Sequence, residues 1–326
     1  MSKRMRLFLV ATLALTVSLF LGYRFIKNQF SSAPDNQLRF KASGEPVSFV
    51  WGSAGHSTSK QQILLPITLA GLPDTLYMLL DFGIPNTILY QQPIDSLSAR
   101  LGSITQESGK RGKVINNFIV KIGNTQVTAQ IAPILPIDQP FDWQQKHKII
   151  GAFGTDLLEY HAAIMDFPRQ LLVLTKEIPA MLQQTAQFHA FQFSGRRILL
   201  PGNLNEESAT FMYDSGAEDF QLSTNQSTFN RLKTGTEYQS TIQSWGYNIT
   251  TTTAPTQASL SLAGTALPLT QISYLEWPKL TQRMLIRMAN MEGMVSNQPF
   301  KESILVLDAP KGQFAVISNQ PSAGNL

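Results

Sequence analysis

Two aspartates, Asp81 and Asp214, each follow a short apolar run and each precede a glycine by two positions, Gly83 and Gly216. This pattern predicts two strands that end in turns, because glycine adopts backbone conformations that other residues avoid. Two carboxylates held about one hydrogen bond apart cannot easily both ionise, so one keeps a proton while its partner accepts one. Such a pair activates water by general acid–base catalysis. The two motifs therefore predict a water-activating site, provided that the turns meet.

A second pair of motifs follows the aspartates. Gly151 precedes Asp166 by 15 residues, and Gly293 precedes Asp308 by the same 15 residues. Both later aspartates lead into a proline, a basic residue and an apolar run, which is typical of a structural turn. A lone Asp-x-Gly is also usually a simple turn. The matched spacing nevertheless favours two copies of one folding unit, each supplying one carboxylate.

The elements that must position these carboxylates are mainly β-strands. With 326 residues, 43% of them hydrophobic, the chain can bury a sizeable core. Its apolar runs are rich in residue types that favour strands. We expect a mainly β fold with two pseudo-symmetric lobes, over residues 46–178 and 187–319. An interlobe connection is expected at 179–186, a linker at 31–45 and a short tail at 320–326.

The N-terminus predicts a membrane anchor. Three basic residues precede sixteen uncharged residues, 7–22, and no small-x-small cleavage site follows them. We therefore favour one uncleaved transmembrane helix within residues 1–30 over a cleaved signal peptide. The positive end is expected in the cytoplasm and the remainder of the chain across the membrane, in the periplasm if the source is a Gram-negative bacterium.

The charge balance and the lack of cysteine exclude several classes of function. Five of the 26 basic residues lie within the first thirty positions, which leaves 21 basic against 22 acidic side chains in the rest of the chain. No broad cationic face is expected, so we exclude a nucleic-acid partner. Without cysteine the chain has no disulfide, thiolate nucleophile or zinc–thiolate site. The four histidines lack paired metal spacing, and we expect no metal and no cofactor.

The pattern resembles the retropepsin-like and pepsin-like aspartic proteases over roughly residues 60–318. In that family each lobe supplies an apolar-apolar-Asp-Thr/Ser-Gly turn, and a downstream apolar-apolar-Gly strand passes beside it. The segment Asp214-Ser215-Gly216 matches the first motif closely, and Ile149-Ile150-Gly151 matches the second. The resemblance implies a bilobal, acid-protease-like β-barrel fold in one monomer that contains an internal pseudo-dimer. It also implies an aspartic endopeptidase with Asp81 and Asp214 as the catalytic pair.

Supporting roles follow from the same resemblance for Gly83, Ser215, Gly216, Gly151 and Gly293. Two hairpins are expected to close over an extended peptide substrate, one with its tip near Gly112 and one near Trp245, Gly246 and Tyr247. Backbone pairing with such hairpins binds peptides with little sequence specificity. An equally open interpretation of Trp245 and Tyr247 is that they pack the second hairpin against its own lobe.

Three residues depart from the family pattern and motivate other functions. Phe82 stands where Thr or Ser is expected, Ile84 where a small residue is usual, and Glu292 where an apolar residue should precede Gly293. The second hypothesis is therefore a proteolytically silent module that binds peptides or an envelope protein between the lobes. A third is a scaffold in which the repeat only sets the shape. The triplet Asp81-Phe82-Gly83 also occurs in kinases, but no glycine-rich nucleotide loop precedes it.

Overall fold

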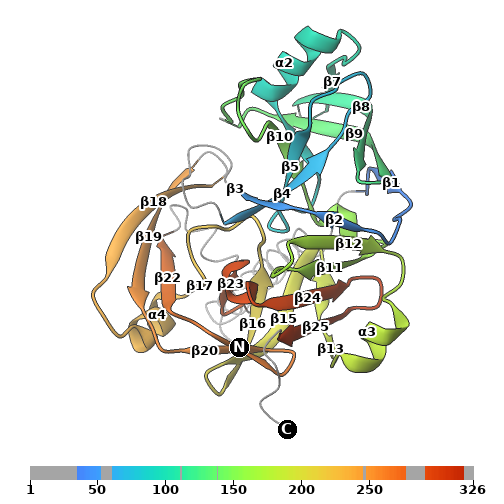
Figure 1. Ribbon diagram of the computed structural model, residues 1–326. Helices are drawn as coiled ribbons and strands as arrows, with labels where there is room; N and C mark the ends of the chain where they lie inside the picture. Colours follow the sequence, from blue (N-terminus) through green and yellow to red (C-terminus); the bar gives the residue numbers. More distant parts are fainter. Residues whose placement is uncertain are drawn as a thin grey trace, which may run out of the picture.

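The computed structural model describes residues 35–52, 61–110, 112–137, 139–244, 247–276 and 291–318. The predicted anchor within residues 1–30 and the predicted tail at 320–326 lie outside these ranges. Within them, no helix has the length and apolar character needed to span a bilayer. The fold is mainly β, and its strands form two sheet-rich lobes, as the sequence predicts (Figure 1).

The first lobe is built on one sheet in the strand order β3-β4-β5-β10-β6-β9-β8-β7, and β1 joins it through β9. The central strands β5 and β10 run parallel, and β10 runs antiparallel to β6. The elements are β1 (Leu38–Phe40), β3 (Val50–Gly52), β4 (Gln62–Ile67), β5 (Leu76–Leu80), β6 (Ile88–Tyr90), α2 (Gln91–Leu101), β7 (Glu107–Gly109), β8 (Gly112–Ile122), β9 (Thr125–Leu135), β10 (Ile149–Phe153) and the 3-10 helix η1 (Thr155–Leu158).

The second lobe repeats this arrangement in the order β18-β19-β22-β17-β23-β16-β15-β20-β21, with β14 paired to β15. Here β16 and β23 run parallel and β17 runs antiparallel to β23, so the two lobes share their central topology. The elements are β14 (Gln192–Ser194), β15 (Arg197–Leu204), β16 (Glu207–Tyr213), β17 (Leu222–Thr224), α4 (Gln226–Leu232), β18 (Tyr238–Ser244), β19 (Tyr247–Pro255), β20 (Ser259–Leu262), β21 (Thr265–Pro268), β22 (Gln271–Glu276), β23 (Gly293–Val295) and η2 (Gln298–Phe300).

A third sheet joins the lobes in the order β13-β25-β24-β11-β12-β2. Its strands are β2 (Pro46–Ser48), β11 (Ala162–Asp166), β12 (Leu171–Thr175), β13 (His189–Ala190), β24 (Ser303–Asp308) and β25 (Gln313–Ser318), and α3 (Ala180–Thr185) lies in the predicted interlobe connection. In the central pair, Ile164 faces Val306. Each is the thirteenth residue after the glycine of its own lobe, Gly151 or Gly293. Equivalent residues therefore face each other, which places a pseudo-twofold axis between β11 and β24.

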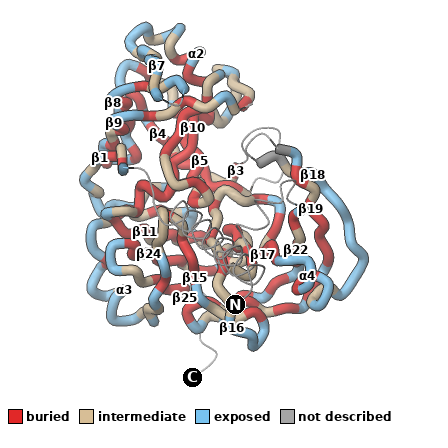
Figure 2. The backbone as a smooth tube through the Cα atoms, turned by 180° about the vertical axis from the view of Figure 1, so that it is seen from behind, coloured by how far each residue is buried: buried red, intermediate tan, exposed pale blue. Residues whose placement is uncertain are grey.

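The core explains why the central strands have few polar residues. β10 is buried along its whole length, and β4 and β5 are buried at all but one position each. Figure 2 shows β4, β5 and β10 as a continuous buried layer in the first lobe. Strands covered on both faces favour continuous apolar runs over alternating patterns. The aspartate turns are thus attached to rigid, buried strands.

The expected closed β-barrels are wrong for the part of the chain that the structure describes. The sheet of each lobe is an open path whose end strands, β3 and β7 or β18 and β21, do not pair with each other. In the first lobe β4 reaches β8 only through the Thr68–Lys121 bridge. β4 ends at Ile67, and the chain soon turns at Gly71, which has a φ of +80°, so a longer ladder does not form.

The predicted linker at 31–45 also needs correction. β1 lies within it and pairs antiparallel with β9, from Leu38↔Ala129 to Phe40↔Val127. Asn36 is buried, and its Nδ2 donates to the backbone oxygen of Asp156 at 2.8 Å. Residues 35–45 therefore belong to the first lobe, because the strand and the buried amide tie them to its sheet.

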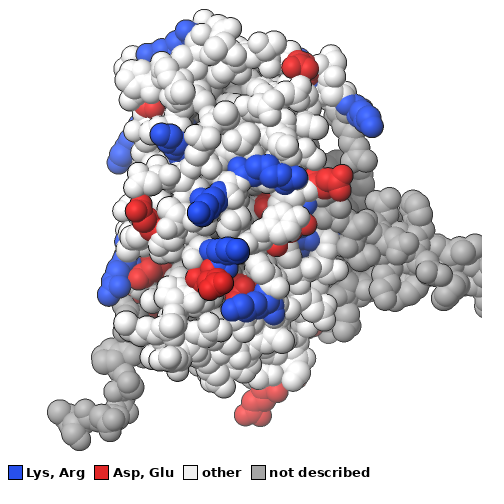
Figure 3. Space-filling model, turned by 90° about the vertical axis from the view of Figure 1, so that its right-hand side faces the viewer, with Lys and Arg blue, Asp and Glu red and all other residues white. Residues whose placement is uncertain are grey.

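Exposed charges of both signs lie close together on the face drawn in Figure 3. Arg231 and Glu207 illustrate the pattern in the second lobe, where their side chains form a two-point ion pair at the surface. Arg100 and Lys148 both contact Asp74 in the first lobe. Such mixed charges are typical of a solvated protein surface.

Candidate active site

Asp81 and Asp214 occupy equivalent places at the ends of equivalent strands. β5 ends one residue before Asp81, and β16 ends one residue before Asp214. The backbone N–H of Asp81 donates to Phe153 O on β10, and that of Asp214 donates to Val295 O on β23, both at 2.9 Å. The parallel neighbouring strand therefore fixes the position of each aspartate along the strand direction.

The two turns also have the same internal hydrogen bonds. The carboxylate Oδ1 of Asp81 accepts from the Gly83 N–H, and that of Asp214 accepts from the Gly216 N–H, both at 3.0 Å. The backbone oxygen of Asp81 accepts from the N–H of Ile84, three residues later, at 3.3 Å. The backbone oxygen of Asp214 accepts in the same way from the N–H of Ala217. Each carboxylate is thus oriented by its own backbone before any contact across the lobes.

The glycines show that the turns face each other. A Cβ atom added to Gly83 would lie 2.5–2.6 Å from all three carboxyl atoms of Asp214. A Cβ added to Gly216 would collide in the same way with the carboxyl group of Asp81. Each carboxylate therefore lies against the glycine of the opposite lobe. The structure brings together the four residues that the sequence singles out, although 133 positions separate the two aspartates.

Gly151 and Gly293 allow the neighbouring strands to pass closely. A Cβ on Gly151 would collide with the backbone oxygen of Ile88, and one on Gly293 with that of Ser223. In each lobe the glycine-bearing strand lies between the aspartate strand and the outgoing strand. These two glycines support the turns and do not touch the carboxylates.

Ser215 joins the two turns. Its buried Oγ donates to Leu80 O and accepts from the Phe82 N–H, both at 2.8 Å. The equivalent position in the first lobe is Phe82, whose ring is buried and lies edge-on to Tyr213, with 6.2 Å between ring centroids. The hydroxyl brace across the lobes is therefore made from one side only.

Ile84 and Glu292, the other two departures, have local partners. Ile84 is buried in an apolar cluster of the first lobe that includes Leu79 and Tyr90, so its bulk is taken up by its own lobe. Glu292 Oε1 accepts from Asn225 Nδ2 at 2.7 Å. Asn225 in turn caps α4 by accepting from the Thr228 N–H. Glu292 therefore replaces an apolar contact with a hydrogen bond near the start of a helix.

The electrostatics of the pair are unequal. Burial, followed by the charge of Asp214, raises the pKa of Asp81 from 3.8 to about 8, although the Gly83 N–H opposes the shift. Burial also raises the pKa of Asp214, but the N–H groups of Gly216 and Ala217 and a hydrogen bond from Asp81 oppose the rise. The pKa values of both carboxyl groups are therefore raised, and the two groups titrate as one pair that shares a proton. Both side chains keep partial solvent access, which lets water reach them.

Two tyrosines complete the walls of the pair. The pKa of Tyr90 is raised by burial and then by the charge of Asp81, and the pKa of Tyr213 is raised by burial and then by Asp214. Both phenols therefore stay neutral beside the carboxylates. Tyr213 OH donates to Asn297 Oδ1 at 2.6 Å, so this hydroxyl has a structural partner.

The hairpins expected over the site are present as backbone pairings. Gly112 pairs with Gly109 at the β7–β8 turn and has a φ of +131°. β18 and β19 pair down to Ser244↔Tyr247. Trp245, Gly246 and the Tyr247 side chain lie outside the described part of the chain. Among the described residues, neither hairpin makes a hydrogen bond to the aspartates.

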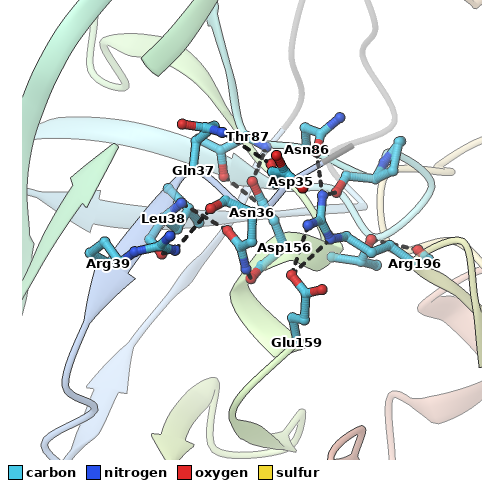
Figure 4. Close-up of polar contacts among 12 residues, drawn as sticks. Asp35, Asn36, Gln37, Leu38, Arg39, Asn86, Thr87, Asp156, Glu159 and Arg196 are labelled. Atoms are coloured by element: carbon cyan, nitrogen blue, oxygen red, sulfur yellow. Dashed lines mark hydrogen bonds and ion pairs between the residues drawn. The ribbon is translucent and has the colours of Figure 1, made fainter. Parts of the chain in front are cut away.

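Sequence reasoning missed the polar residues that hold the turns from outside. Gln62 Nε2 crosses from the first lobe to Gly216 O at 2.9 Å, and Asn297 Nδ2 donates to Ser215 O at 2.7 Å. On the other side, Arg196 of the second lobe reaches the turn of Asp81 in the first (Figure 4). None of these residues has a spacing motif. Pseudo-symmetry offered a signal for Gln62 and Arg196 alone, since Gln62 begins β4 and Arg196 directly precedes β15.

Among the described residues, potential metal ligands do not cluster, and one large cavity lies away from the pair. No group of three or more potential metal ligands occurs in the ranges that the structure describes. A cavity of about 840 Å³ lies in the second lobe beside Thr210, Asn225 and Glu292, and its lining includes neither aspartate. No protein-family model and no curated protein matches the chain. The geometry of the pair is therefore the main guide to function.

Proposed function

We propose that the protein is an aspartic endopeptidase with an acid-protease-like fold, related to the retropepsin-like and pepsin-like enzymes. The observation that carries this proposal is the reciprocal contact in which each aspartate carboxylate lies against the glycine of the opposite turn. Only carboxylates held so close share one proton, and that arrangement serves to activate water. A matched strand, glycine and turn on both sides of a pseudo-twofold axis support the same conclusion.

The chemistry needs only the two carboxyl groups and water. Asp214 takes a proton from water as the water oxygen attacks the carbonyl carbon, while Asp81 gives its proton to the carbonyl oxygen. The resulting diol collapses when Asp214 returns its proton to the amide nitrogen and the C–N bond breaks. Asp81 recovers a proton from a diol hydroxyl in that step. The products are a carboxylic acid and an amine, and the pair regains its single proton.

The substrate class and the location belong to the same proposal. The proposed substrate is an extended peptide, because strand-like pairing with a hairpin or a sheet edge binds its backbone. The chain acts as a monomer, since both carboxylates come from one polypeptide. The basic and apolar segment at residues 1–30 tethers it to a membrane, with the lobes in the extracytoplasmic space.

One observation favours a second candidate, a peptide-binding module without turnover. The brace across the lobes comes only from Ser215, because Phe82 has no hydroxyl. A catalytic group displaced by about 1 Å can lose on the order of a hundredfold in rate. Binding between the lobes tolerates a displacement of that size better than catalysis does.

Cleavage of a diverse peptide mixture at acidic and at neutral pH tests the proposal. Asp81→Asn and Asp214→Asn should each reduce kcat/KM by at least about 10³-fold, because each removes one proton-transfer group. Asp166→Asn is the control, since its carboxylate serves the β11–β12 turn. Full activity in either dyad variant would refute the mechanism. Binding of peptides by a wild-type protein that cleaves none of them would favour the module.

A further inference from the structure

The segment that follows Asp81 is held by a polar network. The Thr155 N–H donates to Ile84 O at 2.9 Å. Asp156 is buried, and its carboxylate accepts from the Thr87 N–H at 2.6 Å and from the Thr87 hydroxyl at 2.9 Å. Both ends of the segment 84–87 are therefore hydrogen-bonded to η1, and Figure 4 shows the contact between Thr87 and Asp156.

Arg196 enters this network from the other lobe. Its side chain is 2% exposed. Nη1 donates to Asn86 Oδ1 at 2.6 Å and to Pro85 O at 3.5 Å, and Nη2 and Nε donate to Glu159 Oε2 at 2.7 and 3.1 Å. The Arg196 backbone oxygen accepts from the Thr155 hydroxyl at 2.6 Å. One residue of the second lobe thus contacts the first lobe through both its main chain and its guanidinium.

Arg196 has a backbone conformation that is unfavourable for a residue with a side chain. Gly195 and Arg196 form the two-residue turn between β14 and β15, with φ values of +56° and +57°. Such turns strongly favour glycine, asparagine or aspartate, because a Cβ atom is crowded at positive φ. A long side chain at this position is therefore retained for its contacts.

The turn of Asp214 is held by neutral amides and not by a cation, since Gln62 donates to Gly216 O and Gln298 donates to Glu218 O. Asn86 is the fifth residue after Asp81, and Asp219 is the fifth after Asp214. Asp219 is exposed, and it makes no hydrogen bond or ion pair within the ranges that the structure describes. The turn that lacks its own hydroxyl at position 82 is the one that Arg196 holds.

We propose that Arg196 is a positioning residue that holds the turn of Asp81 against the second lobe, in place of the hydroxyl that Phe82 lacks. The inference deepens the proposed endopeptidase function and rests on it. The guanidinium touches neither aspartate, so it acts through Pro85 and Asn86, four and five residues beyond the catalytic carboxyl.

The test compares Arg196→Met, Arg196→Lys and Arg231→Met in the full chain. Arg231 is the matched control, because it forms a two-point pair with Glu207 at the exposed surface of the second lobe. Arg196→Met should lower kcat for a peptide cleaved by the wild type by about 100-fold and change KM by less than about threefold. It should also move the alkaline limb of the pH–rate profile to lower pH, because a displaced Asp81 feels less of the Asp214 charge.

Rescue separates positioning from simple stabilisation. Arg196→Lys should recover at least about tenfold of the lost kcat, since it keeps a cation and one donor but loses the two-point geometry. Arg231→Met should leave kcat, KM and the pH profile within about twofold of the wild type. Equal profiles for Arg196→Met and Arg231→Met would overturn the proposal. If Arg196→Met does not fold, Glu159→Gln and Arg196→Lys take its place, and an unmoved pH profile in both has the same force.

A readout without substrate keeps this inference distinct from the proposed function. In the wild type, the raised pKa of Asp81 makes the pair's contribution to the melting temperature larger at pH 4 than at pH 8, and Asp81→Asn should remove that difference. All proteins in this comparison carry Asp156→Asn, because Arg196 also lowers the pKa of Asp156. In that background Arg196→Met should reduce the difference and Arg231→Met should leave it unchanged. If the wild type cleaves no peptide, the endopeptidase proposal fails, and this comparison still decides the role of Arg196. If Arg196→Met keeps the full difference in melting temperature between pH 4 and pH 8, the proposed role of Arg196 is wrong.

Discussion

The two aspartate turns have the same backbone but are held by different chemistry. Neutral amides hold the turn of Asp214: Gln62 donates to Gly216 O, Asn297 to Ser215 O and Gln298 to Glu218 O. Charged groups dominate around the turn of Asp81, where Asp156 binds Thr87 and Arg196 binds Asn86. Main-chain ladders set the position of each carboxylate, so side-chain braces are free to diverge between the repeats.

The position after each aspartate shows the same divergence in the core. The Ser215 hydroxyl donates a hydrogen bond across the lobes to Leu80 O, whereas Phe82 contributes a buried ring that lies beside Tyr213. Tyr213 in turn lies edge-on to Phe300, with centroids 5.6 Å apart. The residue after Asp81 thus contributes edge-on aromatic contacts, and the residue after Asp214 contributes hydrogen bonds to the first turn. Substitutions in and around the two turns test this difference between them.

The largest effect is expected from making the first turn resemble the second. Phe82→Ser should lower the free energy of unfolding by about 3–5 kcal/mol, because it empties a buried aromatic site beside Tyr213. The hydrogen bond that the new hydroxyl can form returns only about 1 kcal/mol. Urea unfolding measures the difference. A variant as stable as the wild type would show that the ring is not a structural support.

The next largest effect is expected on the catalytic rate, from replacing either of the two facing glycines. Gly83→Ala and Gly216→Ala each place a methyl group against the opposite carboxylate and should lower kcat by about 100-fold, or about 2.7 kcal/mol. The two losses should be similar, because the contacts are reciprocal. Gly102→Ala, at the end of α2 with open space around it, is the control and should affect stability alone. A harmless change at either facing glycine would contradict the geometry.

Removing the single brace should have a smaller effect. Ser215→Ala leaves the Phe82 N–H without its acceptor in a buried place, which costs about 1–3 kcal/mol of unfolding free energy. Ser215→Thr keeps the hydroxyl and should retain most of the stability. Thermal unfolding of the two variants, measured side by side, gives the comparison. Equal stability of the alanine and threonine variants would mean that the brace contributes nothing.

The weakest effect is expected from the pH dependence of the charged network. Burial raises the pKa of Asp156 from 3.8 to about 6, even though Thr87 and Arg196 oppose the shift. The native state therefore binds this proton more tightly than the unfolded state does between those values. The stabilising contribution of Asp156 is present below about pH 4 and lost as the pH rises through about 6.

Asp156→Asn isolates that contribution, because the slope from the catalytic pair is common to both proteins. The unfolding free energy of the wild type should fall relative to the variant between pH 4 and 6, by less than about 1.4 kcal/mol per pH unit. Urea titrations at several pH values measure the difference. A rise over the same interval would mean that Asp156 is ionised more readily in the folded protein than in the unfolded chain.

Much of the architecture was predictable because it depends on local patterns of apolar and turn residues. Apolar runs with turn residues predict the strands, and the repeated spacing predicts two lobes whose equivalent residues, such as Ile164 and Val306, face each other. The error at residues 31–45 has a local cause as well: β1 is only three residues long and is stable only because β9 pairs with it. The predicted barrels failed because closure depends on how far each ladder continues, as at the single Thr68–Lys121 bridge.

The two carboxylates and two glycines of the turns can be identified from the chain alone, because a strand, an aspartate and a glycine within a few residues form one local unit. The contacts of those turns depend on how the chain folds. The folded arrangement raises the pKa of both carboxyl groups, through burial and the approach of the two turns. It also brought Arg196 to Asn86, 110 positions away. Contacts between distant segments leave no spacing in the chain, since they depend on how two finished lobes pack together.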